Sequence, residues 1–590
     1  LWSLYCHTVV HNVDIYTYNL SPSTSIYQKM AKEIICVREF KQHLLAMNCR
    51  CRGVSTLLTN LLHQRQPMDH YDESWQAQYD DGSCNEIYMD KPPYALVGLS
   101  FKEAAWIVYT ECQVILFGIK SYYEGSEHRE MLLNPENNYI IKADDLCVYM
   151  CESPREVNDI NNMNMRYVRE KVKAIKQSRS AERGKTPQKM TSMTSIRSEL
   201  KASLIHASQS TPITPLSEDG LSRSSSLRRV SSMESNRTMP SPSIQHFQLA
   251  RLPTPRMALL KPTDDPSIDI EASPVCYLLD NPETLEEMTI ESADHLSGHI
   301  LVCMHRKVSN IYKFILNLRS PQLKPNELQH IVFLCTSLPT EKTFDLLCRF
   351  PKVSFMRGDC QRPEDLIKAG VKRAKQVVVM SERECLDQNQ RTSDSPAIMT
   401  SHLLDLLLQD KAYDSPHIVN LVEKSNIRFM HLLQGKDVAE EIDVFYTPAY
   451  AAGNVVVDSL LSNVLLSQTY YKPDIVSVIK ALCGLSGPLY DKDTAHMLMC
   501  GTKFHPHLFK KSRHLMLITL PLFFIDKSFS VLFECLILDH EVVTLGLLRA
   551  PDENMGNELS FVYTNPVPSL ILKRTDKIYV LASQGWSFSK

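Results

Sequence analysis

Glycine and long apolar runs are both scarce in this chain. Of its 590 residues 18 are glycine, and none lies in the loop 305–310, which follows the first strand of an expected α/β lobe. A dinucleotide pyrophosphate needs glycines there, because only glycine lets the backbone approach closely. The longest strongly apolar run, Leu515–Ile525, is interrupted by Thr519 and Pro521 and is too short for a bilayer, which takes about 20 residues. These two absences argue against a glycine-loop dinucleotide enzyme and against a membrane span in these residues.

Motifs of catalysis and of zinc binding are missing as well. The sequence contains no GxSxG, HExxH or P-loop pattern. Its 17 cysteines are an odd number scattered through apparent strands and helices, which favours buried free thiols in a reducing cytosol. Cys49 and Cys51 form a C-x-C without the second pair that a zinc knuckle needs. We therefore predict no catalytic and no cofactor-binding residue, and a protein that is not an enzyme.

The region 299–433 alternates short β-rich runs with helical patterns. This alternation is typical of βαβ units, which build a parallel sheet with helices on both faces. We expect an α/β, doubly wound, Rossmann-like lobe. Its expected strands are 299–304, 330–335, 353–356, 376–380 and 417–422, and its expected helices are 311–318, 343–350, 363–369, 397–408 and 427–433.

The remaining segments differ in character. Helical spacing marks 36–66 and the stretch from Pro448 to Tyr471, whereas 94–150 and 485–590 look β-rich and a single strand is expected at 13–18. Between Met163 and Lys261 the chain holds 18 Lys and Arg against 6 Asp and Glu, a net of +12, and it is rich in Ser and Pro. Such a tract buries too little apolar surface to fold, so we expect a disordered linker.

Within this tract the sequence LRRVS at 227–231 predicts phosphorylation of Ser231 by a kinase that recognises basic side chains, although arginine and serine also co-occur by chance in such tracts. Nucleic-acid binding by the same basic tract is the rival reading. The tract lacks interleaved aromatic residues and any known module, so no nucleic-acid partner is expected.

Two elements of the first half recur in the second half. LLTNLL at 57–62 resembles LLSNVL at 460–465, with Gly53 and Gly453 upstream. The Asn-Pro pair at Asn134 resembles the pair at Asn565, and each is followed at equal offsets by a lysine and an aspartate. Two matches in the same order indicate a tandem duplication. The α/β lobe of the first copy is expected to precede Leu1, which makes that copy N-terminally truncated.

A Rossmann-like lobe, a helical crossover and a β-rich lobe in tandem resemble the RCK (regulator of K⁺ conductance) domains of Slo-family high-conductance potassium channels. The resemblance is carried by EIICVREFKQHLLAMNCRCRGVSTLLTNLLH (33–63), SCNEIYM (83–89), RFPKVSFMRGD (349–359) and PAYAAGNVVVDSLL (448–461). The second lobe is most similar to the sodium-activated (Slack/Slick) branch, and LVGLSF (96–101) is also similar to the calcium-activated (BK) branch.

The resemblance implies four segments. The first, 1–152, is the C-terminal part of a first RCK domain, and 153–262 is the disordered basic linker. The Rossmann-like lobe of a second RCK domain is 263–445, and its crossover helices and β-rich lobe are 446–590. The segments 53–66 and 453–469 are expected to form the crossovers on which the lobes pivot.

The resemblance also implies an intracellular ion, Na⁺ or Ca²⁺, as gating ligand. The sodium-activated branch places an aspartate after the strand equivalent to 376–380, where this chain has Ser381. The nearby Glu382, Glu384 and Asp387 are the candidate ion ligands, and their alternative is a solvated acidic loop. The consecutive aspartates of the calcium-activated branch are dispersed here, so a calcium bowl is not predicted.

The function implied is a cytoplasmic gating module of a homotetrameric potassium channel in the plasma membrane, coupling ion binding to the opening of a pore outside this chain. Two alternatives stay open. One is a Rossmann-type dinucleotide-binding enzyme, and the other is a free-standing RCK transport regulator.

Overall fold

The computed structural model describes residues 15–19, 33–63, 65–122, 129–136, 138–183, 256–259, 275–308, 310–382, 394–408, 417–434, 443–484, 513–583 and 585–588. The chain divides into two compact units, Leu1–Arg169 with Pro253–Lys590, and Glu170–Leu252. The first unit contains both copies of the repeat. Below, "first copy" means the part of the chain before residue 153 and "second copy" the part after residue 262.

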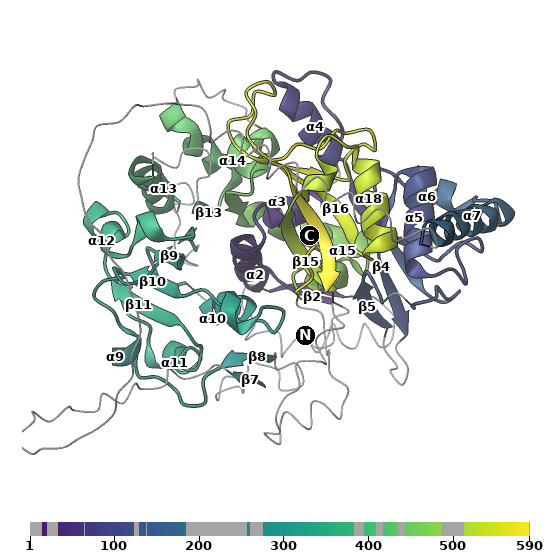
Figure 1. Cartoon of the computed structure of the whole chain (residues 1–590). Coiled ribbons are helices and arrows are strands. Elements are labelled where there is room, and N and C mark those ends of the chain that lie inside the picture. The colour runs from purple at the N-terminus through teal and green to yellow at the C-terminus, as the bar shows by residue number, and fades with distance from the viewer. Residues whose placement is uncertain are drawn as a thin grey trace, which may run out of the picture. The chain divides into compact units, whose positions relative to one another are not determined.

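The second copy contains a six-stranded parallel sheet of order β11-β10-β9-β12-β13-β14 (Figure 1). This is the doubly wound order of a Rossmann fold, so the expected α/β lobe is confirmed. The strands are β9 (Ile300–Met304), β10 (Ile331–Cys335), β11 (Val353–Arg357), β12 (Gln376–Met380), β13 (His417–Leu421) and β14 (Val455–Val457).

Helices cover both faces of this sheet. Alternate residues of the strands, such as Leu301, Val377 and Val455, form one buried cluster with α12 (Pro363–Lys368) and α13 (Ser395–Leu407). Toward the other face lie α10 (Ile311–Leu318) and, from the first copy, α2 (Val37–Arg50), which contacts α10, β13 and β14. The continuous apolar runs of the strands follow from this, because both of their faces are buried.

Three details of this lobe differ from the sequence prediction. β14 is a sixth strand inside the stretch that we assigned to a helix. We did not predict it because three valines are too few to show a periodicity and Val457 also fits the helical spacing. The helix expected at 343–350 is only α11 (Glu341–Phe344), and the one expected at 427–433 is the 3₁₀ helix η7 (Lys424–Gln434). Shorter elements of the lobe include α9 (Leu285–Met288), η3 (Pro325–Glu327) and η4 (Val371–Arg373).

The first copy repeats the end of this lobe. Its strands β1 (Tyr16–Asn19) and β2 (Glu33–Cys36) pair in parallel, and the chain then enters α2 and α3 (Val54–Asn60). In the second copy β14 leads in the same way into α15 (Asp458–Tyr471) and α16 (Ile475–Leu482). By position α2 therefore corresponds to α15, and α3 to α16. The match of LLTNLL with LLSNVL, which pairs α3 with α15, is wrong, and the crossovers are 37–60 and 458–482.

The crossover helices are exchanged between the copies. α2 lies on β13 and β14 of the second copy, while α15 lies on β1 and β2 of the first, and α2 and α15 also contact each other. Each copy thus supplies a helix to the sheet of the other.

Each copy also has a four-stranded antiparallel sheet, and the two sheets have equivalent orders, β3-β6-β4-β5 and β15-β18-β16-β17. Each carries one irregularity in its register, at Leu116/Gly118 and at Thr544/Gly546. The strands are β3 (Glu86–Asp90), β4 (Ile115–Tyr122), β5 (Arg129–Leu133), β6 (Leu146–Cys151), β15 (Arg513–Thr519), β16 (Val543–Arg549), β17 (Phe561–Thr564) and β18 (Lys577–Ser583).

Helices that the sequence analysis did not predict accompany these sheets. They are α4 (Ser74–Ser83), α5 (Phe101–Cys112) and α18 (Phe529–Asp539). The stretch 94–101 forms turns that end at the start of α5, so the strand expected there is wrong. Ser100 and Glu103 form a capping box at this point, a signal that the sequence contains and that marks a helix start.

The beginning of the expected linker is also helical. α6 (Pro154–Asn161) and α7 (Met165–Arg183) occupy residues that we assigned to a disordered tract from 153 onward. α6 buries Val157 and Ile160 at helical spacing, and Pro154 stands at its first turn, where proline is tolerated. The strands β7 (Arg256–Leu259) and β8 (Val275–Leu278) form a separate antiparallel pair. Within the described ranges no helix combines the length and the apolarity that a bilayer crossing requires.

Candidate functional site

The predicted ion ligands are only partly described. Glu382 lies directly after β12 at the carboxyl edge of the parallel sheet, where open α/β sheets bind their ligands, and its side chain is half-buried. Glu384, Asp387 and Ser231 lie outside the described residues. Among the residues that the structure does describe, no three His, Cys, Asp or Glu side chains are grouped so as to hold a metal ion.

A buried polar network lies at the same edge of the sheet. Asp394, at the start of α13, is fully buried and accepts hydrogen bonds from the backbone N–H of Val422 (2.8 Å) and Glu423 (3.0 Å) and from Asn426 Nδ2 (2.8 Å). The Ser381 hydroxyl also donates to it, at 3.4 Å. Several donors therefore share its negative charge, as a buried carboxylate requires.

A second carboxylate, Asp458, completes this network with a lysine from the first copy. Asn420 Nδ2 donates to Asp458 Oδ1 at 2.7 Å, and Lys41 Nζ lies 3.0 Å from Asp458 Oδ2 and 3.1 Å from the Ser381 carbonyl oxygen. Burial raises the pKa of the Asp458 carboxyl, while the Lys41 ammonium and the hydrogen bond from Asn420 oppose that rise. The ammonium of Lys41, a residue of α2, thus connects the ends of β12 and β14.

Sequence reasoning missed Lys41, Asp394, Asn420 and Asp458. One of them carried a signal. Asn420 is a polar residue inside an apolar strand, so it needs a partner.

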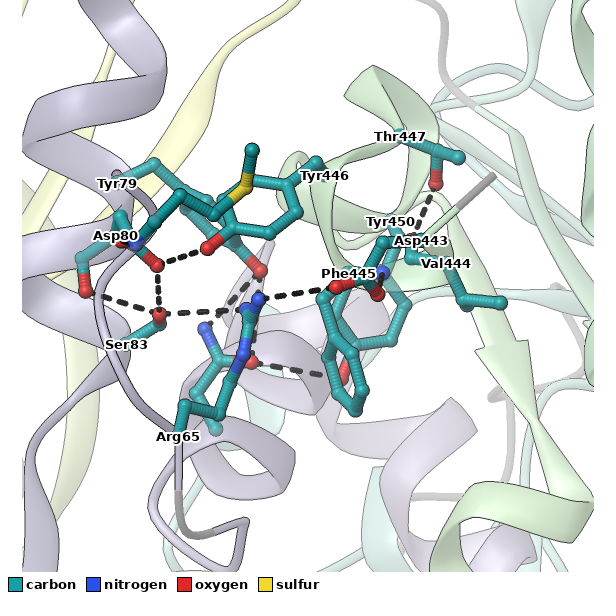
Figure 2. A network of polar contacts seen from close by, with 12 residues as sticks. Arg65, Tyr79, Asp80, Ser83, Asp443, Val444, Phe445, Tyr446, Thr447 and Tyr450 are labelled. Atoms are coloured by element: carbon teal, nitrogen blue, oxygen red, sulfur yellow. Dashed lines mark hydrogen bonds and ion pairs between the residues drawn. The ribbon is translucent and has the colours of Figure 1, made fainter. Parts of the chain in front are cut away.

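A second network joins the copies through Arg65 (Figure 2). Its guanidinium stacks over the rings of Phe445 (4.5 Å) and Tyr446 (4.4 Å), lies 3.5 Å from Asp443 Oδ2, and donates to the Ser83 hydroxyl at 3.3 Å. The hydroxyl of Tyr446 in turn donates to Asp80 of α4. A planar cation suits this place, because guanidinium can stack and hydrogen-bond at once. The 3₁₀ turn η8 (Val444–Tyr446) is thereby fixed against the first copy.

The two Asn-Pro turns make equivalent contacts between the copies. Asn134 follows β5 with φ of 41°, and its Nδ2 donates to the carbonyl oxygens of Glu541 (2.9 Å) and Leu581 (2.8 Å). Asn565 follows β17 with φ of 44°, and its Nδ2 donates to Gln113 O at 3.1 Å and to Asn85 Oδ1 at 3.0 Å. The repeat indicated by these turns is confirmed by this reciprocal geometry.

Two glycines, Gly53 between α2 and α3 and Gly453 before β14, also meet. Gly53 and Gly453 have φ of 78° and 76°, in the left-handed region that favours glycine. A Cβ atom on Gly453 would overlap the Cα atom of Gly53 and lie 3.0 Å from its nitrogen. The two backbones touch here, with no room for a side chain on Gly453.

The loop after β9 is unlike that of a dinucleotide site. α10 begins after Asn310, a residue with φ of 56°, and His305 Nε2 is 3.0 Å from the Thr400 hydroxyl. Side chains with Cβ atoms therefore occupy the turn where the glycine-rich loop would approach a pyrophosphate.

Comparison with known proteins gives matches on both copies. Residues 295–430 match the family model of the calcium-activated potassium channel slowpoke-like RCK domain, and residues 32–119 match that of the calcium-activated BK potassium channel alpha subunit. Both families describe potassium channels and not enzymes.

Among curated proteins, potassium channel subfamily T member 1 of Gallus gallus is 23% identical over 525 residues, which cover 80% of this chain and 42% of that protein. The human protein of the same name is 23% identical over 527 residues, with the same shares. This chain therefore spans less than half the length of the curated relatives it matches.

Among solved structures, the human SLO3 gating ring is similar with a TM-score of 0.67 and 18% identity, covering 99% of this chain and 84% of that one. This likeness shows the same fold. Together with the family matches, it confirms the resemblance to the RCK gating-ring region of Slo-family potassium channels.

Proposed function

We propose that this chain, whose two copies resemble Slo-type RCK domains, is the cytoplasmic ligand-sensing gating module of a tetrameric potassium channel. Four subunits with two RCK copies each would form a ring beneath a pore that lies outside these residues, at the plasma membrane. Binding of an intracellular ion, Na⁺ or Ca²⁺, would be coupled to pore opening and hence to potassium transport across the membrane. The matches to RCK and BK families and the gating-ring fold support this proposal.

The exchange of crossover helices carries the proposal. α2 packs on the sheet of the second copy, and α15 packs on the strands of the first. Because packed elements move as rigid bodies, a rotation of one lobe drags a helix of the other copy with it. An arrangement of this kind passes a change at one ligand site to the whole module, which a set of independent binding domains would not do.

The ligand must distinguish two arrangements of the lobes. It shifts the equilibrium only by its difference in affinity for the two, typically about 1–3 kcal/mol or a 5- to 150-fold change in affinity. Glu382, Glu384 and Asp387 are our proposed ligands, because carboxylate oxygens suit both hard cations and the loop follows a strand end of the parallel sheet.

A kinase is the second proposed partner, acting on Ser231. Arg228 and Arg229 precede this serine and give the basic context that such kinases recognise. A phosphate there would add about two negative charges to a tract of net positive charge and weaken the repulsion among its basic side chains.

Recording from excised patches of the full-length channel tests the proposal. The triple variant E382Q/E384Q/D387N should need at least tenfold more internal Na⁺ or Ca²⁺ for half-maximal current, because the ion loses its charged ligands. E341Q, at an exposed glutamate of α11, which follows β10 and not β12, is the matched control and should respond as wild type. An unchanged triple variant would reject the ligand assignment, and a chain that conducts no K⁺ under any ion would reject the channel function itself.

A further inference from the structure

The buried contact of Lys41 has the chemistry of a cation site. Lys41 as a whole is 1% exposed. Its ammonium lies between two oxygen acceptors, the main-chain carbonyl of Ser381 (3.1 Å) and the carboxylate oxygen Asp458 Oδ2 (3.0 Å). Carbonyl and carboxylate oxygens converging on one point are the donor set that proteins use for hard cations. Here the cation belongs to the protein.

Among the described residues, Lys41 is the cation that balances the negative charge of Asp458. Asp394, the other carboxylate of this network, already accepts two backbone N–H groups and the amide of Asn426. Asn420 supplies one neutral donor to Asp458, at Oδ1. The remaining oxygen, Oδ2, faces the ammonium.

The three groups also come from different parts of the chain. Lys41 lies on α2 of the first copy, Ser381 follows β12, and Asp458 follows β14. A cation at this position therefore holds two strand ends of the second copy to a helix of the first, which is the contact that the exchanged crossover creates.

We infer that the Lys41 ammonium is a tethered cation that fills an alkali-cation site between the two copies, so that this contact is held without a free ion. When the ammonium is removed, the oxygens of Ser381 and Asp458 bind Na⁺ or K⁺ in its place. The inference goes beyond the proposed gating function, since it concerns a cation supplied by the chain and holds whether or not the chain gates a pore.

The test is thermal unfolding of the purified chain at constant ionic strength, with choline chloride replaced stepwise by NaCl or KCl. K41M should melt lower than wild type in choline and regain part of the loss in NaCl or KCl with a saturable dependence on concentration. Wild type should show no such cation-specific rise. K102M is the matched control: it removes a partly exposed lysine, 3.2 Å from Glu541, and should behave as wild type in all three salts.

The double variant K41M/D458N separates the site from general salt effects. It removes both charges of the Lys41–Asp458 pair, so it should melt above K41M in choline and should no longer respond to Na⁺ or K⁺. The inference is overturned if K41M responds to the three salts as wild type does, if K41M/D458N keeps the Na⁺ response, or if NaCl and KCl restore none of the stability that K41M loses in choline.

Discussion

The touching glycines give the sharpest stability prediction. In the variant G453A the new methyl group overlaps Gly53 Cα and lies 3.0 Å from Gly53 N, both backbone atoms that move only with their helices. The left-handed φ of 76° adds strain of its own. We expect about 1–2 kcal/mol for the φ and about 1–3 kcal/mol for the overlap, so the free energy of unfolding should fall by about 2–5 kcal/mol.

A second glycine separates the two costs. Gly298 has a similar φ of 66°, but a Cβ there would meet no atom within 4 Å. G298A should therefore lose only about 1–2 kcal/mol, the strain cost alone. Both variants change the unfolded chain in the same way, so that contribution cancels in the comparison. Urea denaturation followed by far-UV circular dichroism gives both values, and equal losses for the two variants would refute the close approach of the copies.

Three further predictions concern other contacts. N134A and N565A should each lose about 1–3 kcal/mol of unfolding free energy, because N134A removes the donor to the buried Leu581 carbonyl oxygen and N565A removes the donor to the side-chain oxygen of the buried Asn85. N161A, at an exposed residue, should change it by less than about 0.5 kcal/mol. R65K keeps the charge but loses the stacked plane over two rings, so we expect a loss of about 1 kcal/mol in the same assay; no loss would show that the stacking contributes nothing. Burial, with a smaller effect of Arg319, lowers the pKa of His330 from its ordinary 6.5 to about 4. The stability that neutral His330 provides is therefore present above about pH 6.5 and is lost as the pH falls toward 4. H330Q should flatten the fall of unfolding free energy over that range, and a slope equal to that of wild type would contradict this assignment.

Much of the second lobe could be predicted, because its strands are buried on both faces. A run such as QVVVM is apolar throughout, and the observed β12 has the bounds that its sequence predicts, Gln376–Met380. β14 was missed since a run of three valines carries no period. The helix α5 was missed for a different reason: it is buried along most of its length, so its sequence shows little amphipathic contrast, and only its capping box marked it.

The contacts between the copies could not be predicted, because they join residues hundreds of positions apart. The repeat was visible at the Asn-Pro turns, where one short motif performs the same task in both copies. It was misaligned at the crossover, where LLTNLL and LLSNVL share an apolar spacing that any buried helix can have. Lys41 and Asp458 illustrate the limit: each looks like an ordinary charged residue of a helix until the fold brings them to 3.0 Å.

The central claim is that this chain couples an intracellular ion to a potassium pore. Its most direct test is current recorded from excised patches of the full-length channel in symmetrical K⁺, with internal Na⁺ and then internal Ca²⁺ raised from zero. We predict that at least one of the two ions opens a K⁺-selective conductance, and that the ion response disappears when residues 263–590 are deleted. A full-length protein that conducts no K⁺ with either ion at any voltage, or an ion response that survives the deletion, would contradict the account.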